Sequence, residues 1–295
     1  MRNAFRTVVF ALAAAVVAAL PVSAQTLGWE GPTGTFITPV AYVATSQAKS
    51  LGRPVVGYHF LAGGPVVGDF STVNFTEGFA KRFEAGYTSE VHAAGDAAIS
   101  ANWEHDMSIV HGKAQIVDEN AGHHHFVPAI SLGGIYRFND HYSNDGVNGQ
   151  TTSNGDIYLV ATKTITETKI IPIVLTAGVR GTNAALWGLA GNASEWTPSA
   201  FGSAAFVFKG PATSKFALGA EIEQQPNHAL ATAANGVQSA VLNFPTSESY
   251  AIRIFPSAKY KLNLDAGVLH SGNYLGQGVK IDTNARVAFA ISYGF

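Results

Sequence analysis

The sequence predicts an all-β protein, a transmembrane antiparallel up-and-down β-barrel of about 14 strands, with 12 as the fallback count. Three observations lead to this prediction. Apolar and polar residues alternate with period two through segment after segment, the chain begins like an exported protein, and its last ten residues, Arg286 to Phe295, form an alternating strand that ends on an aromatic residue.

The alternation is clearest between Lys259 and Val268, where Tyr260, Leu262 and Leu264 share one face and Asn263 and Asp265 share the other. A barrel with lipid-facing apolar residues and a soluble sandwich both produce such alternation. The segments run to about ten residues, as a tilted membrane strand requires, and their second face is rich in glycine and charge, so the barrel is favoured. The predicted strands are 34–44, 54–64, 69–79, 81–91, 96–105, 107–118, 124–138, 154–165, 169–181, 199–209, 214–223, 247–257, 259–269 and 283–295.

The longer links 139–153, 182–198, 225–246 and 270–282 alternate with tight links, as extracellular loops alternate with periplasmic turns. Counting back from Phe295, this alternation needs an even number of strands, and the weak candidate 96–105 brings the number to fourteen.

The first residues resemble a secretory signal peptide: Arg2 and Arg6 precede 13 apolar residues, Val8 to Leu20, and small residues lead to Ala24. The apolar run is shorter than the ~20 residues of a membrane-spanning helix. We therefore expect residues 1–24 to be a cleaved signal peptide and residues 25–295 to be a single barrel domain in the outer membrane of a Gram-negative (diderm) bacterium.

Composition excludes several classes of protein. The chain has no cysteine, so it has no disulfides and no cysteine-linked lipid anchor. Without Arg2 and Arg6, 16 basic and 20 acidic side chains leave a net charge near −4, which argues against a nucleic-acid partner.

The final strand also predicts a partner. Its outer face carries aromatic and aliphatic residues and ends at the chain's last residue, as in the C-terminal signature by which the barrel-assembly machinery recognises bacterial outer-membrane proteins. The residues of this expected insertion signal are Phe289, Ile291, Tyr293 and Phe295.

The second face of the strands predicts a charged lumen. These inward charges have two possible roles: they pair across a narrow interior and seal it, or they line a water-filled path for polar solutes. The expected lumen-lining residues are Glu84, Glu90, His111, Lys113, Arg137, Arg180, Glu221, Glu223, Arg253, Lys261, Asp265 and Arg286.

Two motifs raise the possibility of site chemistry. His141, Ser143 and Asn144 resemble the His-x-Ser-Asn element of outer-membrane phospholipases and lipid A deacylases, in which the histidine activates the serine, but the surrounding Asn, Asp and Gly favour a loop. His123 to His125 suggest a metal site, yet neighbouring residues of a strand point to opposite sides, so a polar turn is favoured. No metal and no cofactor are expected.

Three stretches together resemble the YjbH family of outer-membrane proteins associated with exopolysaccharide production. The matching positions are Gly34, Thr38-Pro39, Lys113 to Glu119, Pro128-Ala129, Gly133 and Ala161-Thr162-Lys163. They cover about a third of the chain and carry no catalytic meaning. The resemblance implies a link to exopolysaccharide.

The sequence thus predicts an outer-membrane barrel with a structural role or a role in passage or secretion of polar or polysaccharide material, in contact with outer-membrane lipid. Two alternatives remain: a lipid ester hydrolase that uses Ser143 and His141, and a secreted β-sandwich binding module.

Overall fold

The computed structural model describes most of the chain after residue 25. The described residues are 26–46, 48, 50–93, 95–96, 106–138, 153–166, 171–184, 186–188, 192–232, 238–243, 246–257, 261–271 and 286–295. The expected signal peptide, residues 1–24, lies outside them.

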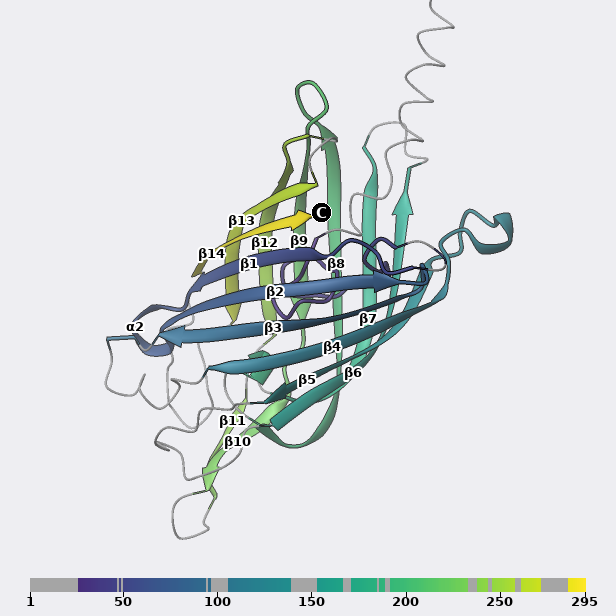
Figure 1. Cartoon of the computed structure of the whole chain (residues 1–295). Helices are drawn as coiled ribbons and strands as arrows, with labels where there is room; N and C mark the ends of the chain where they lie inside the picture. The colour runs from purple at the N-terminus through teal and green to yellow at the C-terminus, as the bar shows by residue number, and fades with distance from the viewer. Residues whose placement is uncertain are drawn as a thin grey trace, which may run out of the picture.

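Twelve of the described strands form one closed antiparallel ring (Figure 1). Each pairs with its neighbours in the chain, and β14 pairs with β1 to close the ring. The barrel strands are β1 (Val55–Ala62), β2 (Asp69–Phe79), β3 (Phe83–Ala93), β4 (Met107–Val117), β5 (Ala129–Phe138), β6 (Ser153–Ile165), β7 (Ile173–Ala184), β8 (Asn192–Lys209), β9 (Lys215–Glu223), β12 (Ser247–Phe255), β13 (Leu262–Ser271) and β14 (Arg286–Gly294).

Two further strands stand outside the ring. β10 (Asn227–Thr232) and β11 (Gln238–Asn243) form a separate hairpin in the connection between β9 and β12, at the lower end of the barrel in Figure 1. A short helix, α2 (Gly64–Val67), connects β1 to β2.

The all-β barrel is confirmed, with the fallback number of twelve barrel strands among the described residues in place of fourteen. Candidate 96–105 lies almost entirely outside the described residues. Candidate 34–44 is wrong as a barrel strand: it joins no barrel ladder and lies inside the ring. Pro39 has no N–H to donate, and the chain there folds back on itself through an isolated bridge between Gly34 and Pro39.

The two ends of the barrel differ in their connections. The links 80–82, 118–128, 166–172, 210–214 and 256–261 lie at the end where β1 starts and β14 stops, which we call the turn end. The opposite end, the loop end, carries the connections after β1, β3, β5, β7, β9 and β13, and most of these are longer. Short periplasmic turns and longer extracellular loops are typical of outer-membrane barrels.

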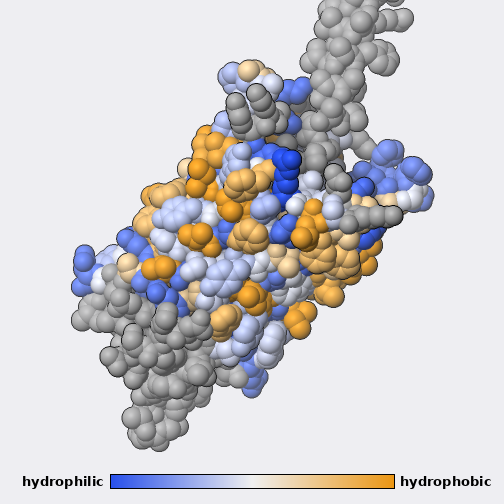
Figure 2. Space-filling view, in the orientation of Figure 1, coloured by the Kyte–Doolittle hydropathy of each residue, from blue (hydrophilic) through white to orange (hydrophobic). Residues whose placement is uncertain are grey.

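The wall of the barrel is apolar outside and polar inside. Ile157, Val179 and Val287 are 61%, 58% and 63% exposed, whereas Thr72, Thr76 and Thr88 are fully buried. Hydrophobic residues are spread over the strands on the face shown in Figure 2. This is the outer-membrane arrangement, and it rules out the alternative β-sandwich, in which Tyr87 and Phe289 would be buried rather than 44% and 42% exposed. No helix within the described ranges is both long and apolar enough to cross a membrane.

Leu159 tests this inside-out arrangement because it lies midway along β6 and faces outward. We expect Leu159→Arg to lower the free energy of unfolding by about 2–4 kcal/mol, the cost of an arginine facing lipid near the midplane. Urea unfolding in lipid vesicles measures this change. Leu51→Arg, at a 67% exposed position before β1, is the control and should change it by less than about 0.5 kcal/mol. Equal effects of the two substitutions would contradict a lipid-facing β6.

Candidate functional site

The interior of the barrel is occupied by the chain's own N-terminal segment, Thr26 to Ala44, which we call the plug. In Figure 1 it is the purple trace enclosed by the strands. All of its residues are buried except Thr35 and Tyr42, which are half-buried. The plug contains no regular helix or strand, so its backbone polar groups need partners from the barrel wall.

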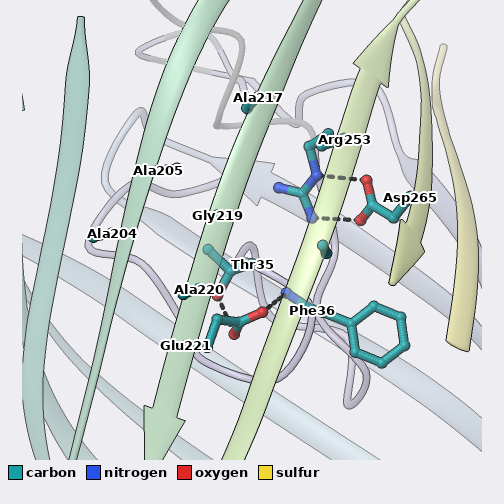
Figure 3. A pocket seen from close by; sticks show the side chains of 11 residues that line it. Thr35, Phe36, Ala204, Ala205, Ala217, Gly219, Ala220, Glu221, Arg253 and Asp265 are labelled. Carbon is teal, nitrogen blue, oxygen red and sulfur yellow. Dashed lines mark hydrogen bonds and ion pairs between the residues drawn. The ribbon is translucent and has the colours of Figure 1, made fainter. Parts of the chain in front are cut away.

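Glu221 on β9 holds the turn of the plug from Thr35 to Thr38 (Figure 3). The backbone N–H groups of Phe36, Ile37 and Thr38 donate to its carboxylate at 2.8, 2.9 and 2.8 Å. The hydroxyls of Thr35, Thr38 and Ser249 lie 2.5, 3.0 and 2.8 Å from the same carboxylate. One buried acid therefore satisfies three successive donors that no secondary structure satisfies.

The turn itself is closed by local bonds. The N–H of Thr35 donates to the carbonyl of Thr38 at 2.9 Å, and the Thr35 hydroxyl lies at the same distance from that carbonyl. Thr26 reaches back to the carbonyl of Gly34 at 2.9 Å. The threonine hydroxyls of this segment thus take part in closing the turn. Gly34 lets the two sides of the turn approach each other, because a Cβ at this position would lie 2.6 Å from the Thr38 carbonyl oxygen.

Lys113 on β4 and Glu84 on β3 form a second anchor. Their side chains are fully buried and 2.9 Å apart. Lys113 donates to the carbonyls of Thr33 and Val40, both at 2.9 Å, while Glu84 accepts from the N–H groups of Thr33 at 3.0 Å and Ala44 at 2.8 Å. The pair therefore ties two distant points of the plug to the same patch of wall.

A chain of alternating charges forms the third anchor. Glu30 of the plug contacts Arg137, Arg137 reaches Asp156 at 2.6 Å, Arg180 lies 3.1 Å from Asp156, and Arg180 reaches Glu223 at 2.9 Å. All five side chains are buried. Burying charges is favourable only when each has a partner, and here every acid touches an arginine.

Two tryptophans donate to buried carboxylates near this chain. The indole of Trp29 in the plug donates to Glu90 at 2.9 Å. The indole of Trp187, in the short link between β7 and β8, donates to Glu223 at 2.7 Å. Trp187 is only 5% exposed, so its side chain is packed against the Glu223 end of the charged network.

Apolar contacts complete the packing. Trp29, Phe36 and Ile37 of the plug belong to a buried cluster with inward residues of the wall such as Phe70 and Phe201. The rings of Trp29, Phe36 and His59 lie 5.5–6.1 Å apart. The interior is therefore a packed core rather than a water-filled channel over this part of the barrel.

At the turn end the plug is held by Tyr42. Its hydroxyl donates to Glu119 at 2.8 Å and lies 2.8 Å from the hydroxyl of Thr164. Burial raises the pKa of Tyr42, so the phenol stays protonated and remains a donor.

One gap in the packing lies beside β8, β9 and β12. A cavity of about 50 Å³ lies between the plug turn and wall residues that include Ala205, Ala217, Gly219 and Ala251. Arg253 and Asp265 border it and form a bidentate pair at 2.7 and 2.6 Å (Figure 3). Arg253 also donates to the carbonyl of Gly34 at 3.1 Å.

The structure places the predicted lumen residues in two groups. Those that are buried inside the ring are Glu84, Glu90, His111, Lys113, Arg137, Arg180, Glu221, Glu223 and Asp265. Arg253, Lys261 and Arg286 are half-buried. Lys261 lies just before β13 at the turn end, where it donates to the terminal oxygen of Phe295 at 3.0 Å, and Arg286 opens β14 at the loop end.

Other sequence predictions are placed outside the lumen or outside the described residues. The expected insertion signal, Phe289, Ile291, Tyr293 and Phe295, is 39–51% exposed on the outer face. The alternative catalytic residues His141, Ser143 and Asn144 lie outside the described residues. His123 to His125 are exposed, and the described residues contain no group of three or more His, Cys, Asp or Glu that could hold a metal ion.

Sequence reasoning missed Glu30, Trp29 and Asp156. Asp156 had a readable signal, because it alternates with the outward residues Ile157 and Leu159 in β6. Glu30 and Trp29 had none, since they lie before the first strand in a segment without period-two alternation.

A family model described as "Protein of unknown function (DUF3034)" matches residues 25–252. The chain belongs to this DUF3034 family. The match includes the whole plug and the strands from β1 into β12, so in this member of DUF3034 the plug and most of its wall contacts belong to the family region. No curated protein matches the sequence.

Among solved structures, the chain is similar to the translocator domain of the autotransporter NalP from Neisseria meningitidis. The two share 10% sequence identity and a TM-score of 0.42, over 84% of this chain and 89% of that chain. A likeness this low says nothing about function. Neither the family model nor this structure supports the resemblance to the YjbH family, and its positions Thr38-Pro39 belong to the plug.

The buried anchor of Lys113 and Glu84 can be tested by removing one partner. We expect Lys113→Met to lower the free energy of unfolding by about 3–5 kcal/mol, because it leaves Glu84 buried without its cation. Urea unfolding in detergent micelles measures the change, and adding Glu84→Gln should recover part of it.

Arg82→Met provides the matched comparison. Arg82 pairs with Asp118 at 2.6 Å, but these side chains are 44% and 56% exposed, so the loss should be only about 0–1 kcal/mol. A lumen filled with water would instead make the two losses similar.

Proposed function

We propose that this DUF3034 protein is an outer-membrane barrel whose plug keeps it closed at rest and that it passes small polar solutes when the plug turn leaves Glu221. The single observation that carries the proposal is the Glu221 clamp, in which one wall carboxylate accepts hydrogen bonds from three successive backbone N–H groups of the plug.

The placement in an outer membrane follows from the exposed apolar wall. Its strands have the length and inside-out polarity of a membrane barrel, and the turn end has the short connections of a periplasmic side. The residues before the plug have the character of an export signal, which supports the same location in a diderm bacterium.

The resting state is closed because the plug leaves little space. The cavity beside the turn measures about 50 Å³, against the ~10–15 Å³ that one water needs on the same measure, so it has room for a few waters. Passage therefore requires movement of the turn.

The chemistry of the gap favours polar solutes. Once the turn is displaced, Glu221 and the pair of Arg253 and Asp265 border a path whose other walls are alanine and glycine. The small side chains leave a wider path, and the charged groups can replace the hydrogen bonds that a polar solute makes with water. No separate observation favours polysaccharide or an ester hydrolase over small polar solutes.

Conductance of the refolded protein in planar bilayers tests the proposal. We expect the wild type to be nearly silent and Glu221→Ala to open steadily. The substitution leaves three buried N–H groups without an acceptor, and each ~1.4 kcal/mol of lost stabilisation raises the open population about tenfold.

Glu248→Ala is the control, because Glu248 lies one strand away on β12 and its hydrogen bond is to the exposed Tyr250. It should stay as silent as the wild type. Heat-modifiable migration on gels verifies that each variant is folded.

A labelling experiment separates the clamp from the conductance. Because the chain has no cysteine, Ile37→Cys can be introduced alone and its maleimide reaction followed. Ile37 is 5% exposed, so labelling should be slow in the otherwise wild-type protein and fast with Glu221→Ala. Fast labelling without conductance would refute the passage role, and slow labelling in both would refute the clamp.

A further inference from the structure

Two lysines stand directly opposite each other at the turn end of the barrel. Lys209 ends β8 and Lys215 begins β9, and the two are paired in the ladder between these strands. Lys209 is exposed and Lys215 is half-buried. Like charges that face each other in an antiparallel pair are destabilising. The two charges therefore cost stability at this position, which favours a functional role for them over a structural one.

Alternation along the two strands places both lysines on the inner face of the wall. Phe206 and Leu218 are each 45% exposed on the outer face. Lys209 follows Phe206 by three residues and Lys215 precedes Leu218 by three, so both lysines start from the opposite face. They stand at the turn-end opening of the lumen, and we call this pair the entrance.

The same inner face leads from the entrance to the cavity beside the plug turn. The next inward pair of the ladder is Val207 with Ala217, and Ala217 lines the cavity of about 50 Å³. Glu221 lies four residues further along β9, at the other side of this cavity (Figure 3). The two lysines are thus at the turn-end side of the path that the proposed function opens along β8, β9 and β12.

No acid close to the entrance balances its charge. Residues 207–217, which form the β8–β9 turn and its strand ends, contain no Asp or Glu, and neither do residues 254–257 at the adjoining end of β12. Glu221 is an acid of the same strand, but it lies six residues from Lys215, which is ~20 Å along an extended strand. This separation exceeds the Debye length of ~8–10 Å at ordinary ionic strength.

The neighbouring turns add more positive charge than negative charge. By sequence, the turn-end links on either side, 166–172 and 256–261, hold three lysines and one acid, Glu167. Lys261 contacts the terminal oxygen of Phe295, and that terminus counts as a second negative charge. Together with the entrance, five lysines stand against two negative charges. The excess of three positive charges is the same if Lys261 and the terminus are both left out.

We propose that the entrance attracts small anions, solutes that carry a carboxylate or phosphate group, from the turn-end side toward the path, an inference that rests on the proposed function for the passage itself. Charges of one sign around an opening in a low-dielectric wall raise the local concentration of counter-ions. Deeper in the path, Arg253 is paired with Asp265, and Glu221 has the opposite sign. The entrance, and not the whole path, therefore sets this preference.

Thiol modification measures the potential at the entrance without any need for conductance. Because the chain has no cysteine, Ala212→Cys can be introduced alone; this exposed position lies three residues from each lysine. Its rates with an anionic and a cationic methanethiosulfonate reagent are measured on the folded full-length protein in nonionic detergent, each divided by the rate of a free thiol. We expect the anionic reagent to be favoured about threefold or more at low salt and the preference to fade as salt is added.

Two double substitutions locate the source of this preference. Lys209→Gln with Lys215→Gln should bring the ratio of the two rates close to that of the free thiol, and Lys209→Arg with Lys215→Arg should retain the preference. The matched control, Lys81→Gln with Arg82→Gln, removes two charges at the same end of the barrel from the link between β2 and β3, and should leave the ratio unchanged. Equal loss with the control, or no preference in the wild type, would overturn the proposal.

Reversal potentials in a salt gradient then test the entrance in the conducting Glu221→Ala variant. We expect this variant to favour anions and the added Lys209→Gln and Lys215→Gln substitutions to abolish that preference. Conductance without anion preference would overturn the role of the entrance and leave the passage role intact. A silent Glu221→Ala variant whose thiol rates still favour the anionic reagent would refute the passage role instead, while the attraction of anions by the entrance would stand.

Discussion

The need to satisfy the backbone polar groups of an irregular segment inside a barrel governs the rest of this structure. The plug has no helix or sheet ladder of its own, and a buried N–H or C=O without a partner costs several kcal/mol. The wall therefore has to supply hydrogen-bond acceptors and donors at the positions where the backbone groups of the plug lie. Glu221 supplies acceptors to the turn, Glu84 to Thr33 and Ala44, and Lys113 supplies donors to two carbonyls.

This constraint explains why so many charges point into the barrel. A carboxylate that serves a backbone N–H in a dry interior must itself be compensated, so the wall pairs acids with bases in neighbouring strands. The chain from Glu30 through Arg137, Asp156 and Arg180 to Glu223 alternates in sign, as compensation requires. The sequence leaves two roles open for the inward charges: pairing that seals the interior, or lining of a water-filled path. On the side of the barrel formed by β3 to β7 the charges are paired and buried, so the first role applies there.

Strands were predictable from the sequence because alternation is local. The period-two pattern places β13 and β14 within a few residues of their observed bounds and assigns Glu221 and Lys113 to the inner face. The plug was not predictable, because residues 36–44 are rich in β-branched and aromatic residues, as a strand is. Only Gly34 and Pro39 hinted otherwise. The partner of Glu221 is about 185 residues away in sequence, and no local pattern encodes such a contact.

The plug is packed differently against the two sides of the barrel. This difference makes a sealed interior compatible with the proposed passage of solutes. The residues of the plug on the β3 to β7 side are fixed by buried ion pairs and by an apolar cluster, and removing all of them from the wall would expose the core. The backbone of the turn from Thr35 to Thr38 faces a different wall, where it binds Glu221 and where a cavity lies beside Ala205 and Ala217. The side chains of Phe36 and Ile37 pack in the apolar cluster. Gly34 and Pro39 pair across the base of this turn. Under the proposed function, opening along β8, β9 and β12 therefore requires the turn to leave Glu221 and requires Phe36 and Ile37 to leave the apolar cluster, while Glu30 and Thr33 remain anchored.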